Sequence, residues 1–316
     1  MASIEAALKL WAKSIEPTAT QKEAASRSYG HLVDLLNKRG LGSRIVDCYL
    51  SGSYRRNTAL RPIGDIDIIF VIDPGQWPGA LLGLADKPNP SAVLKSFARA
   101  LREEYPASST FTQKRSLRLE LGHLHIDCVP AIARVDTDIV LIGNHADETW
   151  FESSPKRHQK ALSAANASNA GLLVPLVKLL KDWNRSLPEE DGRVRSFVIE
   201  TLAVTLFKEV RMRSLEEGLY LFLDFVSNFE GAAERSWPSK LNVKMNLWDG
   251  MYVPDVAGTG SNVAAGIELR RMSAFKRHAV ISRDSLRRAI AAKTVASAVE
   301  HLQALTSHIG TPSKGV

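Results

Sequence analysis

The residues of this chain best suited to chemistry lie in one short run. Asp65 and Asp67 stand two positions apart in Asp-Ile-Asp-Ile-Ile-Phe-Val-Ile, a run typical of a β-strand. Side chains two apart in a strand point to the same face, so both carboxylates project together while Ile66, Ile68 and Phe70 face a core. Paired carboxylates are the hard oxygen ligands that Mg²⁺ prefers, and the turn Gly52-Ser53 just ahead offers backbone N–H groups to a phosphate. The run therefore indicates chemistry on a nucleoside triphosphate.

A third carboxylate would complete a two-ion site, and Asp127 is the candidate. It lies in Leu-His-Ile-Asp-Cys-Val-Pro, where Leu124, Ile126 and Cys128 alternate inward and leave Asp127 on the opposite face. If this strand lies beside the strand at 65–72, the three acids meet. Two Mg²⁺ ions, with Mn²⁺ as an alternative, would then bridge them to a triphosphate, activating an attacking hydroxyl and neutralising the leaving pyrophosphate.

Two histidines share a strand face with the third acid and raise zinc as an alternative metal. His123, His125 and Asp127 make a His-x-His-x-Asp pattern, but no fourth ligand is evident from the sequence. We therefore expect the histidines to line the nucleotide cleft or to sit at its solvent edge.

The elements that must position these acids form an α+β pattern in the first half of the chain. A helix is predicted over residues 20–39, opened by the capping-box sequence Thr20-Gln-Lys-Glu23 and ended by Gly40. Alternation of apolar residues predicts strands at 45–50, 65–72, 115–121, 124–129 and 137–142, and a helix from about 90 to 106 lies between them. This order predicts one mixed sheet.

Helices dominate the second half of the chain. They are predicted at 170–184, at 196–211, after the capping box Ser214-Leu-Glu-Glu217, and at 283–308. We expect residues 1–160 to form one domain, residues 161–309 a helical domain that closes a ligand cleft, and residues 310–316 a disordered tail.

The composition is that of a globular protein suited to polyanionic ligands. Of 316 residues, 45% are hydrophobic and 24% charged, and 41 basic against 34 acidic residues give a net charge of +7. Cys48 and Cys128 both fall in predicted strands, which fits buried thiols in a reducing cytosol. The sequence shows neither a signal-peptide core nor an apolar run long enough for a bilayer, so a cytoplasmic protein without a membrane partner is expected.

The spaced motifs resemble those of a known family. The pattern Gly52-Ser53-x-x-Arg56-x-Thr58, then Asp65-x-Asp67, then Asp127 is similar to that of the DNA-polymerase-β-type nucleotidyltransferases. Within them it most resembles the bacterial cyclic-oligonucleotide synthases (CD-NTases), which are related to cyclic GMP–AMP synthase. The likeness extends to the start of an N-terminal spine helix at 17–22, a linker at 150–158, phosphate-gripping helices at 176–185 and 195–200, and a late motif at 253–263 in which Val256 replaces the usual proline.

The resemblance implies a role for each site residue. Gly52 and Ser53 would hold the triphosphate; Asp65, Asp67 and Asp127 would bind both metal ions and form the catalytic centre; Lys181 and Ser196 would contact the phosphates. The implied fold is a polymerase-β-like mixed sheet with a spine helix and a C-terminal helical domain. The implied activity joins ribonucleoside triphosphates into a cyclic di- or trinucleotide second messenger of anti-phage (CBASS) signalling. ATP is the expected substrate, with GTP or a pyrimidine nucleotide as alternatives. A regulatory protein partner is compatible with this activity, and nucleic acid is not required.

Two other functions stay open at this point. An RNA-acting nucleotidyltransferase, which tails RNA or adds CCA, would use the same carboxylates, but the sequence carries no basic tail or zinc knuckle to hold RNA. A catalytically silent nucleotide sensor would keep the fold without turnover, and the intact set of acids argues against it. The bases, ring size and linkage of a product cannot be read from these motifs.

Overall fold

The computed structural model describes residues 4–38, 41–78, 81–83, 85–229, 241, 243–246 and 250–306. Its internal contacts divide the chain into two compact units. We call Pro17–Gln159 the sheet unit, and Met1–Glu16 together with Lys160–Val316 the helical unit. The tail expected to be disordered, 310–316, lies outside the described residues.

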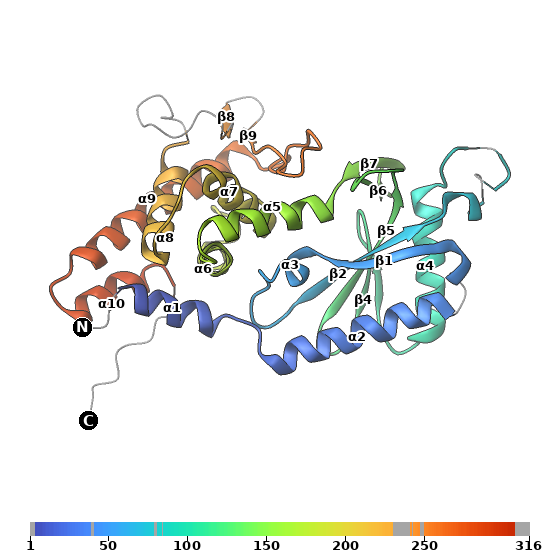
Figure 1. Cartoon of the computed structure of the whole chain (residues 1–316), viewed down its shortest axis with the longest axis horizontal. Coiled ribbons are helices and arrows are strands. Elements are labelled where there is room, and N and C mark those ends of the chain that lie inside the picture. The colour runs from blue at the N-terminus through green and yellow to red at the C-terminus, as the bar shows by residue number, and fades with distance from the viewer. Residues whose placement is uncertain are drawn as a thin grey trace. The chain divides into compact units, whose positions relative to one another are not determined.

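The sheet unit is built on a seven-stranded mixed sheet (Figure 1). The strands are β1 (Ile45–Ser51), β2 (Asp65–Ile72), β3 (Thr110–Thr112), β4 (Leu117–Glu120), β5 (His125–Ala133), β6 (Val140–Asn144) and β7 (Thr149–Ser153). Their order is β1-β2-β5-β4-β3, with β6 pairing to β5 and to β7. Strands β2 and β5 run parallel, and the other pairs are antiparallel. The α+β class expected from the sequence is confirmed.

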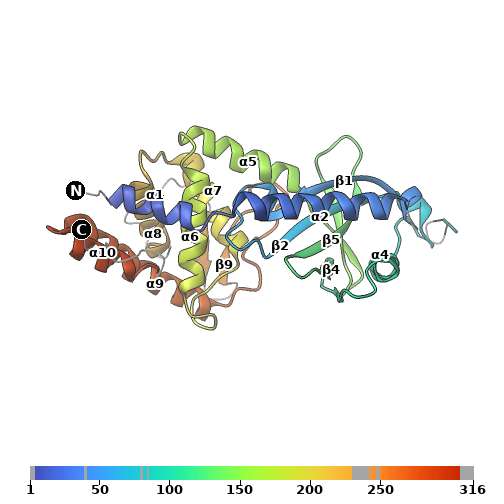
Figure 2. The ribbon, with the colours of Figure 1, turned by 90° about the horizontal axis from the view of Figure 1, so that it is seen from below.

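Two helices cover one face of this sheet. Helices α2 (Ala19–Lys38) and α4 (Pro90–Glu104) lie on the same side of it (Figures 1 and 2) and share one apolar core with the inward side chains of β2 and β5. Ile66, Ile68 and Phe70 are completely buried in that core, as the alternation of the strand requires. The acidic positions of β2 alternate with them and so belong to the opposite face. Three short helical turns complete the unit: η1 (Gly42–Arg44), α3 (Gly52–Arg55) and η2 (Pro74–Gln76).

The start of α2 differs from the expectation by about half a turn. The reciprocal capping pair is formed by Thr18 and Gln21: Gln21 N donates to Thr18 Oγ1 at 3.2 Å, and Thr18 N donates to Gln21 Oε1 at 3.1 Å. The predicted capping box at 20–23 is therefore wrong, because these residues already lie inside the helix. The same chemical pattern occurs two residues earlier, directly after Pro17, which cannot continue a helix backwards.

The helical unit contains most of the remaining elements. They are α1 (Ile4–Ser14), α5 (Pro155–Ser168), which begins in the sheet unit, α6 (Leu173–Ser186), α7 (Ser196–Glu209), α8 (Leu215–Ser227), β8 (Lys244–Asn246), β9 (Gly250–Tyr252), α9 (Leu269–Ala291) and α10 (Val295–Gln303). The predicted cap of α8 is confirmed, since Glu217 N donates to Ser214 Oγ at 3.0 Å. The single helix predicted at 283–308 is wrong: α9 ends at Ala291, and Thr294 caps a new helix. No described helix is long and apolar enough to cross a bilayer.

Helix α1 belongs to the helical unit, whereas the sequence grouped it with the first domain. It buries Leu8, Trp11 and Ala12, and it contacts α6 and α8. The indole Nε1 of Trp11 donates to Asp182 Oδ2 on α6 at 2.8 Å, in buried surroundings. This long-range contact places residues 1–16 in the helical unit, a grouping that short-range sequence patterns do not reveal.

Candidate active site

The three acids come together through the pairing of the two central strands. In the parallel ladder of β2 and β5, Asp67 lies opposite Asp127 and Asp65 lies opposite His125. The row through Asp67 continues on both sides, because Ser51 of β1 pairs with Asp67 and Arg118 of β4 pairs with Asp127. Four neighbouring strands thus present Ser51, Asp67, Asp127 and Arg118 in one line across the sheet.

The glycine turn is packed directly against this row. Gly52 follows Ser51 and has a φ of +64°, a left-handed conformation that favours glycine. A Cβ at Gly52 would stand only 1.7 Å from Asp67 Oδ2, so glycine is needed here for close approach as well as for its φ. The carbonyl of Ser53 accepts from the N–H groups of Thr58 and Ala59, which closes the turn.

Arg56 braces the turn from the inside. Its backbone N–H donates to the Gly52 carbonyl at 3.2 Å, and its side chain is buried. The guanidinium charge of Arg56 acts on Asp67 by lowering the pKa of that carboxyl. Arg56 therefore supports both the backbone and the charge balance of the site.

Arg118 is the functional candidate that sequence reasoning missed. Its Nε donates to Asp127 Oδ1 at 2.8 Å and its Nη2 to Asp127 Oδ2 at 2.7 Å, a two-pronged pair. The same Nη2 lies 3.6 Å from Asp65 Oδ2. The Arg-Leu-Glu alternation predicted a strand around this residue, but only the register of β4 against β5 shows which acid it faces.

Asp67 is the acid whose protonation is most perturbed. Burial, with the nearby charges of Asp65 and Asp127, raises the pKa of Asp67 to about 7, although Arg56 and Arg118 act in the opposite direction. Crowded carboxylates in a poorly solvated place resist ionisation unless a cation joins them. In the structure Arg56 and Arg118 are the cations that partly offset this repulsion.

The donor set fits Mg²⁺ by its chemistry, because carboxylate oxygens on adjacent strands are what hard divalent ions prefer. Across the part of the chain that the structure describes, no three His, Cys, Asp or Glu side chains are arranged to hold an ion together. In the observed arrangement both oxygens of Asp127 accept from Arg118 instead. That Asp65, Asp67 and Asp127 hold a metal ion stays a prediction.

The two histidines have partners of their own. His123 Nε2 lies 3.0 Å from Ser28 Oγ on α2, and His125 is paired across the sheet with Glu120, whose carboxylate lies 3.9 Å from its Nε2. Neither contact brings the histidines together on a zinc-type ligand set with Asp127.

The sequence profile described as the Second Messenger Oligonucleotide or Dinucleotide Synthetase (SMODS) domain matches residues 2–166, just over half of the chain. The chain belongs to the SMODS family. This confirms the resemblance to bacterial CD-NTases, and the matched region contains the glycine turn, the three acids and Arg118.

Individual proteins similar to this SMODS protein include named cyclic-oligonucleotide synthases. A cyclic AMP-AMP-AMP synthase of Acinetobacter is 31% identical over 197 residues, which are 60% of this chain and 54% of that protein. The chain thus spans about half the length of the curated relatives it matches. The structure of an Escherichia coli CdnC:HORMA-deltaN complex superposes with a TM-score of 0.73 at 22% identity, covering 95% of this chain and 96% of that one. The CD-NTase CdnG of Bradyrhizobium diazoefficiens, solved with GTP, gives a TM-score of 0.71 at 18% identity and covers 96% and 97%. These likenesses establish the fold.

The remaining predicted site residues of this SMODS protein lie in the helical unit. Lys181 is buried on α6, and Ser196 is the first residue of α7 and is partly buried. The neighbouring Lys178 is also buried, and its Nζ donates to Glu16 Oε1 at 2.8 Å. Lys178, three residues before Lys181 on the same helix, is thus engaged within its own unit.

Trp77, Tyr252 and Trp248 are aromatic side chains of the kind that stack on nucleotide bases. Trp77 is completely buried, stacked on Phe97 and covered by the Arg44 guanidinium, so it is a core residue of the sheet unit. Tyr252 is partly buried on β9, and Trp248 lies outside the described residues. Of the three, Trp77 is excluded as a base-stacking side chain.

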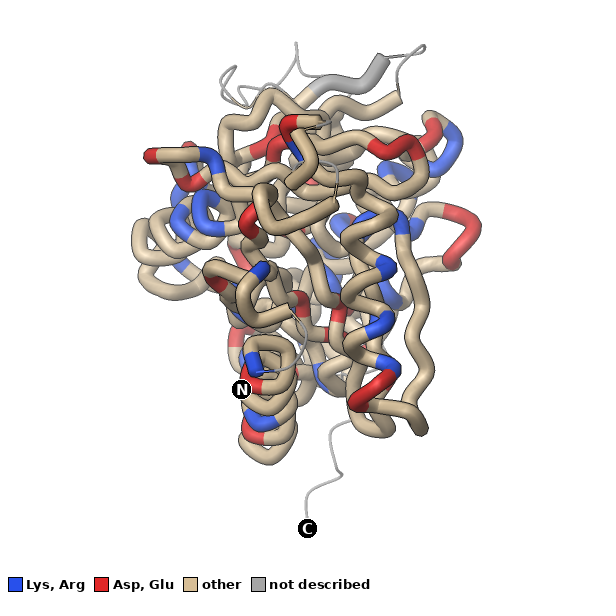
Figure 3. The backbone as a smooth tube through the Cα atoms, turned by 90° about the vertical axis from the view of Figure 1, so that its right-hand side faces the viewer, with Lys and Arg blue, Asp and Glu red and all other residues tan. Residues whose placement is uncertain are grey.

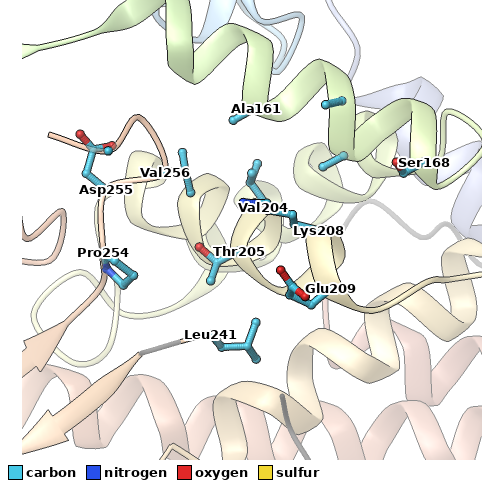
Figure 4. A pocket seen from close by; sticks show the side chains of 13 residues that line it. Ala161, Ser168, Val204, Thr205, Lys208, Glu209, Leu241, Pro254, Asp255 and Val256 are labelled. Carbon is cyan, nitrogen blue, oxygen red and sulfur yellow. The ribbon is translucent and has the colours of Figure 1, made fainter. Parts of the chain in front are cut away.

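The late motif shapes a hollow within the helical unit. A cavity of about 450 Å³ opens between α5, α7 and the loop at 254–258 (Figure 4). Pro254 and Asp255 line it, but Asp255 accepts from Ala257 N and from the Thr259 hydroxyl of its own loop. Asn262 Oδ1 accepts from Val253 N and Ala264 N, so the motif asparagine fixes the backbone of this loop.

Proposed function

We propose that this protein is a Mg²⁺-dependent nucleotidyltransferase that joins ribonucleoside triphosphates into a cyclic di- or trinucleotide and releases pyrophosphate. The cyclic product would be a second messenger of CBASS signalling. The observation that carries this proposal is the row of Asp67 and Asp127 beside Asp65, packed against the Gly52 turn in a SMODS domain.

The residues of the site would divide the work. The backbone around Gly52 and the Ser53 hydroxyl would bind the triphosphate of the donor nucleotide. Asp65 and Asp67 would orient it through the ions, and Asp127 would favour deprotonation of the attacking hydroxyl. Bound Mg²⁺ would supply charge neutralisation for the triphosphate and its pyrophosphate leaving group. Lys181 and Ser196 would add contacts to the phosphates from the helical unit.

The substrate proposal rests on the relatives. ATP is the first choice, because the Acinetobacter protein is named a cyclic AMP-AMP-AMP synthase. GTP is a second, because the Bradyrhizobium CD-NTase was solved with it. A regulatory protein partner is also proposed, since the E. coli CdnC was solved in complex with a HORMA protein.

The decisive experiment is incubation of the full chain with the four ribonucleoside triphosphates and Mg²⁺. We expect pyrophosphate release and a nuclease-sensitive cyclic product that mass spectrometry identifies. Asp67→Asn should abolish both, whereas Asp34→Asn, which removes an exposed carboxylate on α2, should change neither. Because the E. coli CdnC was solved in complex with a HORMA protein, the assay is also run with a HORMA protein added.

The outcomes separate the alternatives. Linear tails on labelled RNA, in place of cyclic products, would identify an RNA-acting enzyme. An RNA-binding surface is typically a continuous basic patch, whereas basic and acidic positions are interspersed along the tube in Figure 3. A cellular effect that survives Asp67→Asn would identify a nucleotide sensor without turnover.

A further inference from the structure

The proposed function assigns no role to Arg118, although this residue contacts two of the three acids. Arg118 lies directly opposite Asp127 in the antiparallel ladder of β4 and β5. Cross-strand neighbours of this kind share a sheet face and contact each other without any rearrangement of the backbone. The contact is therefore a built-in feature of the register.

The guanidinium occupies the position of a cation among the acids. It donates to both oxygens of Asp127 and lies 3.6 Å from Asp65 Oδ2. The side chain of Asp127 is only 8% exposed and that of Arg118 25%, so water screens the pair poorly. A forked pair of this type is among the strongest hydrogen-bonded contacts in proteins. Its single positive charge offsets part of the negative charge of the neighbouring carboxylates.

We propose that Arg118 is the counter-ion of the metal-free triad and that it makes loading of divalent ions depend on nucleotide. This inference rests on the proposed function, since it takes the triad as the metal site. An ion that binds Asp127 competes with the guanidinium for the two carboxylate oxygens. Without nucleotide, replacing the guanidinium by an ion loses the forked Arg118–Asp127 pair and gains only the contacts of the ion with the carboxylates.

A triphosphate changes that balance. Its oxygens supply additional ligands for the ion, and its negative charge offers the released guanidinium another anionic partner. Ion and nucleotide therefore bind cooperatively, and the acids stay paired while the site is empty. Arg118 acts here through the acids, as a positioning residue.

The test measures Mn²⁺ binding to the full chain by electron paramagnetic resonance, with and without a non-hydrolysable ATP analogue. Wild type should bind Mn²⁺ weakly alone and tightly with the analogue. Arg118→Gln removes the charge and the fork, and it should tighten binding of Mn²⁺ alone by about ten- to a hundredfold, the range expected for loss of one charge-assisted pair. Arg118→Lys should lie between the two, because an ammonium cannot bind both oxygens as a fork.

A matched control is available on the same sheet. Arg134 directly follows β5 and forms an ion pair with Glu152 of β7, at the far end of β5 from His125 and Asp127, so Arg134→Gln should leave Mn²⁺ binding unchanged. Thermal unfolding in EDTA and in Mn²⁺ checks folding: Arg118→Gln should be less stable than wild type in EDTA and should gain more from Mn²⁺.

Two results are kept apart. If Asp127→Asn abolishes Mn²⁺ binding while Arg118→Gln and Arg118→Lys bind Mn²⁺ alone no more tightly than wild type, the counter-ion proposal is overturned and the metal site stands. If Mn²⁺ binding with the analogue is insensitive to Asp127→Asn, the proposed metal site fails, and the inference about Arg118 fails with it.

Discussion

Replacing Gly52 by alanine is the sharpest test of how the turn and the triad fit together. The new Cβ would stand 1.7 Å from Asp67 Oδ2, whereas real Cβ contacts are essentially never below 3.0 Å. Either the turn or the Asp67 carboxylate must move by more than 1 Å. The φ of +64° adds a backbone penalty of about 1–2 kcal/mol for any residue with a Cβ.

Two separate effects follow from this substitution. The free energy of unfolding should fall by about 1–2 kcal/mol from the backbone term, as urea unfolding measures. Turnover should fall by about a hundredfold or more, because a shift of about 1 Å in a metal-binding carboxylate has consequences of that size in active sites. The fall in turnover is measured as the rate of pyrophosphate release under conditions in which the wild type is active.

Gly64→Ala is the matched control, since Gly64 directly precedes Asp65. A Cβ there meets nothing within 4 Å, and its φ lies outside the positive range. This variant should keep both the stability and the turnover of the wild type to within about threefold in rate. Turnover of Gly52→Ala equal to that of Gly64→Ala would refute the argument that the close approach of the turn to Asp67 sets the site.

Two further predictions concern charge. In EDTA, Asp67→Asn should be more stable than wild type by an amount that grows as pH rises from about 4 to about 7 and is constant above. The reason is that the raised pKa makes the folded wild type hold a proton that the unfolded chain releases, with an upper limit of roughly 4 kcal/mol. If chemical unfolding gives a stability difference between Asp67→Asn and wild type that does not change from about pH 4 to about pH 7, this prediction is wrong. Lys178→Met should lower the free energy of unfolding by about 1–3 kcal/mol, because it breaks a buried pair whose partner Glu16 is half-exposed, and the KM for ATP should stay near that of wild type. A large rise in KM without loss of stability would instead assign Lys178 to the phosphates.

Elements with a strong local pattern could be predicted from the sequence. The bounds of β2 were predicted as observed, because alternation of acids with buried isoleucines leaves only one register that buries the apolar side. The cap of α8 was also predicted, since Ser214 and Glu217 interact within a single turn. The bounds of β2 and the cap of α8 both depend on residues that are close together in the chain, and a local sequence pattern predicts such features well.

Errors arose where two local patterns compete. No Gly or Pro separates 283 from 308, so the run was taken as one helix, whereas Thr294 caps α10 through Ser297 N after α9 has ended. Near residue 20 two overlapping capping sequences existed, and the earlier one, after Pro17, forms the cap. Propensity does not choose between such options, because their energies differ by less than those of the tertiary contacts that each permits.

The motif spacing alone was sufficient to select Gly52, Asp65, Asp67 and Asp127 and to place them in a nucleotidyltransferase family. Only the tertiary structure decided that Arg118 faces Asp127 and that Lys178 is bound by Glu16. The physical reason is that strand alternation states which face a side chain occupies, whereas the partner across that face depends on strand order and register. Those are fixed by burial over the whole sheet, which no local stretch of sequence records.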